Sequence, residues 1–558
     1  DQTKVKSLGS CLGALKRMSI PARRWMLIRV LLGIIRIAAS LSFVWICKEI
    51  VDVVTGASEA ALTGRIALMM GIMAVQLLCN VFSSYCEKLG LLKVHNTLRA
   101  ELFSKVISSE WTGRERFNSG DAVNRLEEDI RVVTDLLCSH IPGSIVTVCQ
   151  LAAASVYMLM MAPGLLWVLV FLMVLAVIGS RLFFFKLRSL TSDIRALDSD
   201  VQQLIQENLQ NRVIALTLIG VTRVVVALDT LQNRLKDKTV RRLNYNAVAR
   251  GFMSLGFMGG YAAAFLWGAL GIKNGTVSFG MMTAFLQLVG QVQRPVADLA
   301  RELPAFIHAL TSIERLMELE SLPAETDGPK WMARGAAGVR FEGVSFEYPG
   351  SHGTRVLDAF SYDFRPGTLT VVAGPTGVGK STLIRLMLGL LKPDRGTVTV
   401  YDAGSSCAAG KPARGNFRYV PQGNSLMSGT IRDNLLLADA SASEEGMRSA
   451  LHTAVADFVF DLPNGLDTVC GEAGGGLSEG QCQRIAIARA LLHRGGILLL
   501  DESTSSLDPE TETRLLANLR SYVRNAPASA DNPQAITVVF ISHREAVMAS
   551  ADELLRLE

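Results

Sequence analysis

The segment Gly374–Thr382 combines residue types that bind phosphate groups. It reads Gly-Pro-Thr-Gly-Val-Gly-Lys-Ser-Thr, and it joins the short apolar run Leu369–Ala373 to a stretch with a helical pattern. Glycines let backbone N–H groups turn inward around phosphate oxygens, and the positive end of the following helix adds to the attraction. In this setting Lys380 reaches the outer phosphates and the Ser381 hydroxyl binds Mg²⁺. The candidate phosphate-binding residues are Gly374, Pro375, Thr376, Gly377, Val378, Gly379, Lys380, Ser381 and Thr382.

Two acidic residues, Asp501 and Glu502, follow a second short apolar run, Ile497–Leu500. A carboxylate at the end of a buried strand can hold Mg²⁺ through the water shell of the ion. The adjacent Glu502 is placed to orient or deprotonate an attacking water molecule. Two carboxylates after a strand can also serve only to cap a turn. The phosphate loop in the same chain favours the catalytic interpretation.

A third motif precedes the helical pattern Cys482–Leu492, and its residues are Leu477, Ser478, Glu479, Gly480 and Gln481. The start of that helix and the Ser478 hydroxyl form a second candidate anion site. With this motif between the phosphate loop and the acidic strand, the chain resembles the ATP-binding cassette (ABC) family, whose signature reads Leu-Ser-Gly-Gly-Gln. The resemblance implies an ATPase that uses ATP and Mg²⁺. It also implies that two such domains dimerise head to tail, so that each signature completes the ATP site of the partner copy.

One signature position departs from the family pattern. Glu479 stands where the family has its first glycine, and it places a negative charge near a turn that would face phosphate. Its side chain either points away from the nucleotide or weakens that site, and the sequence leaves both interpretations open.

Other family positions occur in the expected order along the chain. The resemblance assigns Tyr348 to stacking on adenine, Gln422 to sensing Mg²⁺ and contacting the membrane domain, and His543 to the γ-phosphate. It assigns Ser505–Asp508 to the loop that couples the two ATP sites. It therefore implies catalytic roles for Glu502, His543 and Lys380, and magnesium binding by Ser381, Gln422 and Asp501. A further departure, Ser405–Pro412, is expected to be an irregular surface loop without loss of chemistry.

Long apolar runs fill the first part of the chain. A membrane-spanning helix needs about 20 mostly apolar residues. Six runs qualify, at about Trp25–Val51, Ala67–Tyr85, Pro142–Met161, Leu165–Phe185, Phe252–Ile272 and Phe279–Ile307. A soluble ATPase with an apolar helical core is the alternative, but such a core would not need six runs of this length.

Basic residues concentrate in the N-terminal lead and in the connections 86–141 and 186–251. The opposite connections, Thr55–Gly64, Ala162–Gly164 and Lys273–Ser278, are short and nearly free of them. By the positive-inside rule, the N-terminus, both long connections and the C-terminal domain are cytoplasmic. Apolar residues recur every three or four positions in the second long connection, which predicts helical stalks beyond the bilayer.

The order of a membrane domain followed by an ATPase resembles ABC exporters over nearly the whole chain. It implies a six-helix transmembrane domain with long cytoplasmic extensions over 1–320, a linker over 321–335 and an α/β P-loop ATPase domain over 336–558. It also implies short coupling helices at about Ser108–Ser119 and about Gln206–Leu218.

Polar residues recur at helical spacing within the spans. Gln76 and Asn80 share one face of the second span, and Gln287 and Gln291 share one face of the sixth with Arg294 and Asp298, while the first span carries Arg29 and Arg36. Polar groups in a membrane helix usually face the bundle or a water-filled cavity. Gln76, Asn80, Gln287 and Gln291 are therefore candidate residues of a substrate pathway; hydrogen bonding between helices is the alternative. Arg294 and Asp298 are also consistent with a position at the cytoplasmic end of the span.

Composition agrees with this division. Of the 558 residues, 49% are hydrophobic and only 19% are charged, and the net charge of +5 does not suggest nucleic-acid binding. The nine cysteines form no CxxC pair and are expected to be reduced packing residues. The chain begins at Asp1 rather than Met, so the native protein is expected to extend further.

The sequence thus predicts ATP-driven export, or flipping within the bilayer, by one half of a transporter in a bacterial cytoplasmic membrane. Its expected partners are a second half-transporter, the lipid bilayer and a cargo of unknown class. Intact Lys380, Glu502 and Ser478 favour a homodimer, whereas Glu479 leaves a heterodimer open. An ATP-gated channel or a regulator on the same scaffold is the alternative function.

Overall fold

The computed structural model of the chain describes two compact units. The described residues are 8–58, 61–111, 119–182, 184–348, 355–471, 475–525 and 536–558. The first unit comprises Asp1–Phe103 and Ala122–Glu320, and the second comprises Ser104–Asp121 and Ser321–Glu558. The second unit therefore includes both the predicted linker and a segment from the first long connection.

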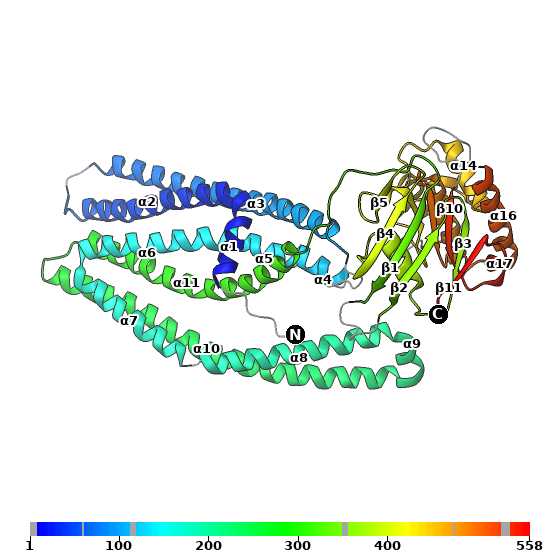
Figure 1. Ribbon diagram of the computed structural model, residues 1–558. Helices are drawn as coiled ribbons and strands as arrows, with labels where there is room; N and C mark the ends of the chain where they lie inside the picture. The colour runs from blue at the N-terminus through cyan, green and yellow to red at the C-terminus, as the bar shows by residue number, and fades with distance from the viewer. Residues whose placement is uncertain are drawn as a thin grey trace. The chain divides into compact units, whose positions relative to one another are not determined.

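The first unit consists of helices (Figure 1). Their bounds are α1 (Leu8–Met18), α2 (Arg23–Val54), α3 (Leu62–Ile107), α4 (Ser119–Asn124), α5 (Ile130–Asp135), α6 (Ile141–Met161), α7 (Pro163–Arg181), α8 (Phe184–Gln210), α9 (Arg212–Ile214), α10 (Val221–Lys273) and α11 (Phe279–Glu320). A single 3₁₀ turn, Ile20–Ala22, precedes α2, and π-helical turns at Arg125–Asp129, Leu136–His140 and Ala215–Ile219 link neighbouring helices.

Four stretches of helix are long and apolar enough to cross a membrane, among the residues that the structure describes. They are Ile20–Val54, Leu62–Ile107, Gly120–Met161 and Val221–Lys273, and they contain four of the six predicted spans. The other two predicted spans fall below this measure. Most of the fourth lies in α7, which ends at Arg181, and its described apolar part is Pro163–Gly179. The sixth lies in α11, where glutamines and Arg294 interrupt the apolar face.

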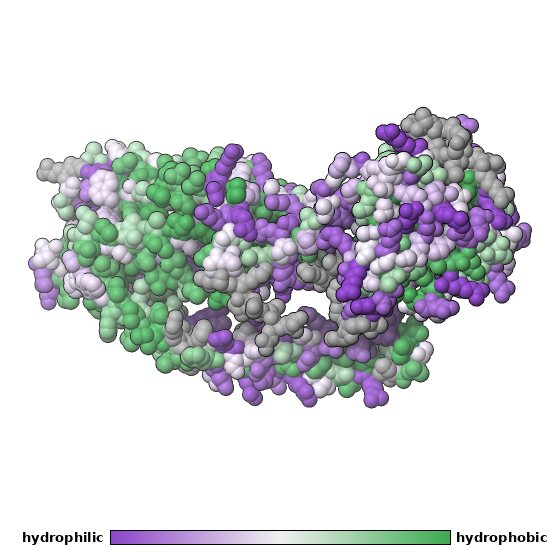
Figure 2. Space-filling view, viewed as in Figure 1, coloured by the Kyte–Doolittle hydropathy of each residue, from purple (hydrophilic) through white to green (hydrophobic). Residues whose placement is uncertain are grey.

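The predicted helical stalks are present. Helix α10 has 53 residues, which corresponds to roughly 80 Å of α-helix, and it packs against both α7 and α8. The Lys238 ammonium lies 2.7 Å from the Asp193 carboxylate and ties α10 to α8. In the first unit, Figure 2 shows apolar residues over the part that holds α7, and polar residues over α8 and the adjoining part of α10.

Small residues allow close contacts between the spans. A Cβ atom on Gly33 of α2 would lie 2.3 Å from a methyl carbon of Val146 on α6, and one on Gly280 of α11 would lie 2.3 Å from the carbonyl oxygen of Lys48. Such close contact is the usual basis of helix association in lipid. Large side chains such as Phe285 and Leu169 fill the core between these helices.

The second unit contains two main sheets. The bounds of its strands are β1 (Gly338–Phe346), β2 (Leu357–Phe364), β3 (Leu369–Ala373), β4 (Arg395–Tyr401), β5 (Ser406–Ala408), β6 (Phe417–Val420), β7 (Gly429–Thr430), β8 (Val469–Cys470), β9 (Ile497–Asp501), β10 (Thr537–Ile541) and β11 (Glu553–Arg556). Its helices are α12 (Lys380–Met387), α13 (Ile431–Leu436), α14 (Glu444–Thr453), α15 (Glu479–Leu492), α16 (Pro509–Asn525) and α17 (Glu545–Ala549). Short 3₁₀ turns lie at Arg414–Asn416, Asp457–Asp461 and Gly465–Asp467.

The larger sheet is parallel, with the order β11-β3-β10-β9-β6. Its strands β3, β9 and β10 are buried along their whole length, as expected for a parallel sheet covered on both faces. The smaller sheet is antiparallel, with the order β2-β1-β4-β5. All nine cysteines are free and buried or half-buried, which agrees with the expected packing role.

Two local predictions need correction. The segment Ser405–Pro412 is not wholly irregular, because Ser406–Ala408 forms β5 and pairs with β4. The first predicted coupling helix does not begin at Ser108, because Ser109 pairs in a β-bridge with Ala324 instead. The remainder of that predicted helix, 112–118, lies outside the described residues. The second, Gln206–Leu218, is helical as predicted except for a turn at Asn211.

One contact between spans offers a direct test of the packing. The Gly280 N–H at the start of α11 donates to the Asp52 carboxylate of α2 at 3.0 Å, and Asp52 is only 8% exposed. We expect Asp52→Ala to lower the free energy of unfolding by roughly 1–2 kcal/mol, because it leaves a buried helix N-terminus without this acceptor. Thermal unfolding in detergent measures the loss. Asp52→Asn keeps an acceptor oxygen and should lie near wild type; an alanine variant as stable as wild type would contradict this assignment.

Candidate functional site

Four neighbouring strands of the parallel sheet carry the predicted site residues at their carboxyl ends. The phosphate loop follows β3, Asp501 ends β9, His543 follows β10, and Gln422 follows β6. Because β3, β10, β9 and β6 are adjacent and parallel, these ends meet at one edge of the sheet.

The phosphate loop has the backbone geometry that its glycines allow. Gly377 and Gly379 have φ values of 90° and 110°, which side-chain-bearing residues rarely adopt. A Cβ atom on Gly379 would also lie 2.6 Å from a methyl carbon of Val356. The loop leads directly into α12, so the N-terminus of that helix faces the loop. This arrangement suits binding of a phosphate chain.

Lys380 is buried at the start of α12. Its ammonium donates to the carbonyl oxygens of Gly374 at 2.7 Å and Pro375 at 3.0 Å, and the residue is 7% exposed. Its described partners are neutral carbonyls of the loop itself. An anion bound in the loop can therefore compete for the ammonium without leaving a buried carboxylate unpaired.

Asp501 and Ser381 form an oxygen pair next to the loop. The Ser381 hydroxyl donates to the Asp501 carboxylate at 3.4 Å, and Asp501 is 3% exposed. Burial raises the pKa of Asp501 above its usual range; the Ser381 hydrogen bond opposes this shift and the nearby Glu502 carboxylate adds to it. A hydroxyl and a carboxylate fit Mg²⁺, which commonly binds one or two protein oxygens together with substrate phosphates. Among the described residues there is no group of three or more His, Cys, Asp or Glu that could hold a metal ion.

Glu502 lies at the centre of the site in an unusual backbone conformation. Its φ is +46°, a value that costs about 1–3 kcal/mol for a residue other than glycine. One carboxylate oxygen accepts a hydrogen bond from the Gln422 amide at 2.7 Å, and the other lies 3.8 Å from Nδ1 of His543. The turn thus aims one carboxylate between two other predicted site residues.

Tyr348 lies beside the first turn of α12. Its hydroxyl is 3.1 Å from the Thr382 hydroxyl, and the Arg385 guanidinium donates to it at 3.1 Å. The guanidinium carbon of Arg385 lies 5.0 Å from the centre of the Trp111 ring, which belongs to the same unit. Sequence reasoning missed Arg385 and Trp111, although Arg385 follows Thr382 by three positions and so shares its helical face.

The signature residues form the start of α15. Ser478 and Gln481 make a capping box, in which the Gln481 N–H donates to the Ser478 hydroxyl at 3.3 Å and the Ser478 N–H donates to the Gln481 side chain at 2.9 Å. A Cβ atom on Gly480 would lie 2.8 Å from the Ser506 carbonyl oxygen, so this turn packs against the predicted coupling loop. Glu479 is exposed in the first turn. Gly474, three positions before Leu477, lies outside the described residues.

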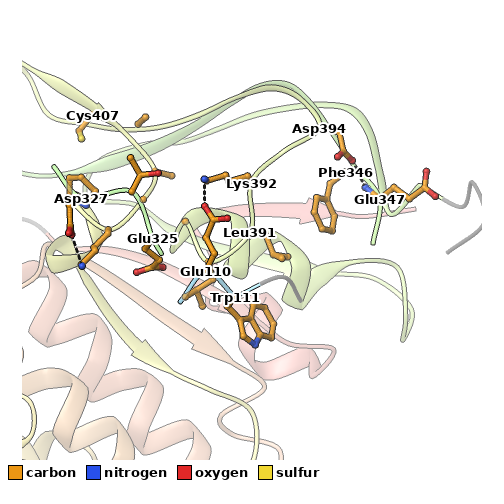
Figure 3. Close-up of a pocket in the computed structure, with 18 residues that line it drawn as sticks. Glu110, Trp111, Glu325, Asp327, Phe346, Glu347, Leu391, Lys392, Asp394 and Cys407 are labelled. Carbon is orange, nitrogen blue, oxygen red and sulfur yellow. Dashed lines mark hydrogen bonds and ion pairs between the residues drawn. The ribbon is translucent and has the colours of Figure 1, made fainter. Parts of the chain in front are cut away.

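The predicted linker is docked onto the rest of the second unit. The Glu110 N–H donates to the Pro323 carbonyl at 2.8 Å, and the Glu325 N–H donates to the Ser108 carbonyl at 3.2 Å. Both segments line a cavity of about 420 Å³ (Figure 3). Three ion pairs hold its walls: Lys392 with Glu110, Lys411 with Asp327, and Arg414 with Glu325. The sequence showed only a composition break here and gave no sign of these contacts.

The candidate pathway residues do not share one cavity. Gln76 and Asn80 line a cavity of about 580 Å³ in the first unit, together with Arg294 and Asp298. Gln291 instead donates from its side-chain amide to the Ser40 hydroxyl at 3.0 Å. Gln287 is half-buried and does not line that cavity.

This combination of parts defines the class of the protein. A helical unit with several membrane spans is joined to a unit whose phosphate loop, acidic strand and glutamine meet at one edge of a parallel sheet. The chain is a multi-pass membrane protein of the ABC transporter class, and it couples ATP hydrolysis to transport.

Comparison with known families and structures supports this classification. The family model of the ABC transporter transmembrane region matches residues 26–296, and a second family model, described as ABC transporter, matches residues 357–505. The chain belongs to the ABC transporter family and has the organisation of an exporter-type half-transporter. It is 28% identical over 553 residues to an uncharacterized ABC transporter ATP-binding protein of Mycobacterium tuberculosis, covering 97% of this chain and 93% of the relative.

Two further comparisons concern a solved structure and a relative that matches half of this chain. A solved bacterial Atm1-family ABC exporter with ATP bound has the same fold, with a TM-score of 0.77, 22% identity, and coverage of 96% of this chain and 93% of the other. The mycobactin import ATP-binding/permease protein IrtB of Mycobacterium bovis is 33% identical over 285 residues, which cover 50% of this chain and 47% of the relative.

Removal of the charge on Asp501 is expected to raise the stability of the protein and to abolish its activity. The folded protein raises the pKa of Asp501, so ionisation of this carboxyl lowers the free energy of unfolding. The loss begins as the pH rises past the unfolded pKa of about 3.9 and is complete above the folded pKa. We expect Asp501→Asn to raise the thermal unfolding temperature of the nucleotide-free protein at pH 7.5 and to abolish magnesium-dependent ATPase activity. The stabilisation should shrink as the pH falls towards 4.

Asp508 provides the matched control. Its pKa is lowered, first by the hydrogen bond from the Thr511 N–H, so Asp508→Asn should lower the unfolding temperature instead. A drop in unfolding temperature for Asp501→Asn as well would show that the Asp501 carboxylate stabilises the nucleotide-free fold, against this account.

Proposed function

We propose that the chain exports a substrate across the membrane, or flips it within the bilayer, by alternating access driven by ATP hydrolysis in a dimer. The observation that carries this proposal is the Glu502 carboxylate, aimed by a strained turn between Gln422 and His543 beside a phosphate loop. Bound MgATP supplies the reactive phosphoanhydride and the metal charge. The protein contributes position, electrostatics and one proton acceptor.

Each site residue has a role that its surroundings support. Glu502 orients the attacking water and accepts its proton, and Gln422 and His543 hold that carboxylate in place. Lys380 and the α12 N-terminus balance negative charge on the phosphates. The oxygen atoms of Ser381, Asp501 and the Gln422 side chain would hold Mg²⁺, whose charge would offset that of the phosphates. Tyr348, fixed by its hydroxyl contacts with Thr382 and Arg385, presents its ring to the adenine.

A second copy completes each ATP site. The signature turn of α15 is exposed, and its polar groups form a helix N-terminus that suits the γ-phosphate of a nucleotide on another chain. Intact Lys380, Glu502 and Ser478 in one chain support two working sites and therefore a homodimer. We infer the domain boundaries 1–320, 321–335 and 336–558 for each copy, with the docked linker belonging mechanically to the ATPase side.

ATP-driven closure reaches the spans through the cytoplasmic connections. Ser108–Trp111 and the helical segment Gln206–Ile219 are the proposed transmission elements. The positive-inside pattern supports a cytoplasmic N-terminus and ATPase domain in a bacterial inner membrane. Outward transport is part of the proposal and not a finding, because one relative, matched over half of this chain, carries the printed name of an importer. Uptake into inside-out vesicles tests the direction.

The role of Glu502 can be tested by Glu502→Gln, which replaces one carboxylate oxygen with an amide nitrogen and keeps the shape of the side chain. We expect Glu502→Gln to lower steady-state ATP turnover by at least about 10³-fold, because the amide cannot accept the proton, while the protein keeps bound ATP. Turnover and retained nucleotide are measured on protein reconstituted in lipid. Glu510→Gln, an exposed carboxylate on α16, serves as the control and should match wild type. Normal turnover in Glu502→Gln would remove the proposed base.

Glu479 departs from the family signature, and its replacement is expected to improve the affinity for ATP. Glu479 lies in the first turn of α15, where its negative charge competes with a phosphate for the same positive helix end. We expect Glu479→Gln to lower the KM for ATP about two- to fivefold, a range that corresponds to the 0.3–1 kcal/mol of a charge at a helix end. Glu479→Asp keeps the charge and should resemble wild type. An unchanged KM in Glu479→Gln would place this side chain away from the nucleotide.

A further inference from the structure

Arg544 joins two parts of the ATP site that are far apart in the sequence. It directly follows His543 and forms the N-cap of α17, just after the carboxyl end of β10. Its guanidinium donates to two backbone carbonyl oxygens, that of Ser505 at 2.9 Å and that of Leu507 at 3.0 Å. Both carbonyls belong to the predicted coupling loop, Ser505–Asp508. One side chain therefore ties the strand end that carries His543 to this loop.

A buried carboxylate holds the guanidinium in place. Glu512 on α16 is 3% exposed, and one of its carboxylate oxygens lies 3.0 Å from the Arg544 guanidinium. The other oxygen is buried and has no hydrogen-bond partner among the residues that the structure describes. A buried carboxylate is costly unless it is paired, so the ion pair restricts where the guanidinium can lie.

The strained turn at Glu502 is held from both sides. The Glu502 N–H donates to the Ile541 carbonyl of β10 at 3.1 Å, and the Ser505 N–H donates to the Glu502 carbonyl at 3.2 Å. Ser505 is thus fixed at its N–H by Glu502 and at its carbonyl by Arg544. A backbone conformation with the φ of Glu502, +46°, persists only where the surrounding structure maintains it. Arg544 is part of that surrounding structure.

The coupling loop also contacts the signature helix, but through longer hydrogen bonds. The buried Gln483 of α15 lies 3.4 Å from the Ser505 hydroxyl, and its amide makes two contacts with Ser506, also at 3.4 Å. The bonds from Arg544 are shorter and come from a charged donor, which makes them the stronger attachment. The position of the loop is therefore set mainly by the side that carries Glu502 and His543.

We propose that Arg544 is a positioning residue for ATP hydrolysis. Paired with Glu512, it clamps the coupling loop to the end of β10 and so keeps the Glu502 carboxylate between Gln422 and His543. The guanidinium suits this task because it presents several N–H donors in one plane together with the charge that the buried carboxylate requires. The inference rests on the role proposed for Glu502 and adds the residues that hold it in position.

A merely structural ion pair would affect stability and leave the reaction unchanged, so the two effects must be measured separately. Arg544→Gln leaves Glu512 as a buried charge without its partner, and we expect it to lower both the unfolding temperature and kcat. The double variant Arg544→Gln with Glu512→Gln also removes the buried charge and should regain most of the unfolding temperature. These variants are compared as full chains reconstituted in lipid.

The kinetics of the double variant test the positioning role. We expect its kcat for ATP to stay at least about tenfold below wild type with a KM within about twofold, because the Glu502 turn has lost a support while the phosphate loop is intact. The described hydrogen bonds and ion pairs of Arg544 and Glu512 include none with the phosphate loop. Glu512→Gln alone should cause a smaller loss of kcat, since Arg544 keeps its bonds to both carbonyls.

Arg514→Gln is the matched control. Arg514 is exposed on α16, two positions from Glu512 and therefore on another face of the helix, and the variant should match wild type in kcat and unfolding temperature. Wild-type kcat in the double variant beside an inactive Glu502→Gln would overturn the positioning role and leave the proposed function standing. Normal turnover in Glu502→Gln would instead remove the proposed base, and this inference with it.

Discussion

The parallel pairing of β3, β10, β9 and β6 is the constraint on which the ATP site depends. Each strand alone is a short apolar run, and none contains a complete set of reactive groups. Only when the four strands align in parallel do the phosphate loop, Asp501, His543 and Gln422 reach the same edge. The full burial of β3, β9 and β10 supplies the hydrophobic stabilisation that can support a strained turn at Glu502. The stability of the sheet and the geometry of the ATP site therefore depend on the same strand pairing.

The second unit also shows how the ATP site can respond to the first long connection of the chain. Trp111 lies against Arg385, Arg385 donates to the Tyr348 hydroxyl, and that hydroxyl contacts Thr382 at the start of α12. A shift of the segment around Trp111 would therefore change the position of the Tyr348 ring and of the phosphate loop. The linker is held beside this segment by backbone hydrogen bonds and is anchored by the ion pairs of Asp327 with Lys411 and of Glu325 with Arg414. A movement of either segment would therefore act on the same surface.

Local sequence signals predicted the chemistry better than the packing. Glycine spacing and a following Lys-Ser pair were enough for the phosphate loop, since its backbone geometry depends on residues next to each other in the chain. All six spans were predicted from apolar length, although Gln287, Gln291 and Arg294 make α11 less apolar than the other spans and the described apolar part of α7 is short. The pairing of Ser109 with Ala324, and of Glu325 with Arg414, joins residues more than eighty positions apart, and no periodicity could reveal it. The cavity that Arg36 and Arg294 both line was equally hidden, because it depends on which helices enclose it.

The central claim is that ATP lies between the phosphate loop of one copy and the signature of another, and complementation in trans tests it most directly. A Lys380→Ala chain has an intact signature, and a Ser478→Arg chain has an intact phosphate loop, so each should be inactive as its own homodimer. When the two chains are co-expressed and purified together, a mixed dimer contains one complete composite site. The account predicts that ATPase activity reappears in the mixture at a fraction of the wild-type rate. A mixture as inactive as either chain alone would contradict it.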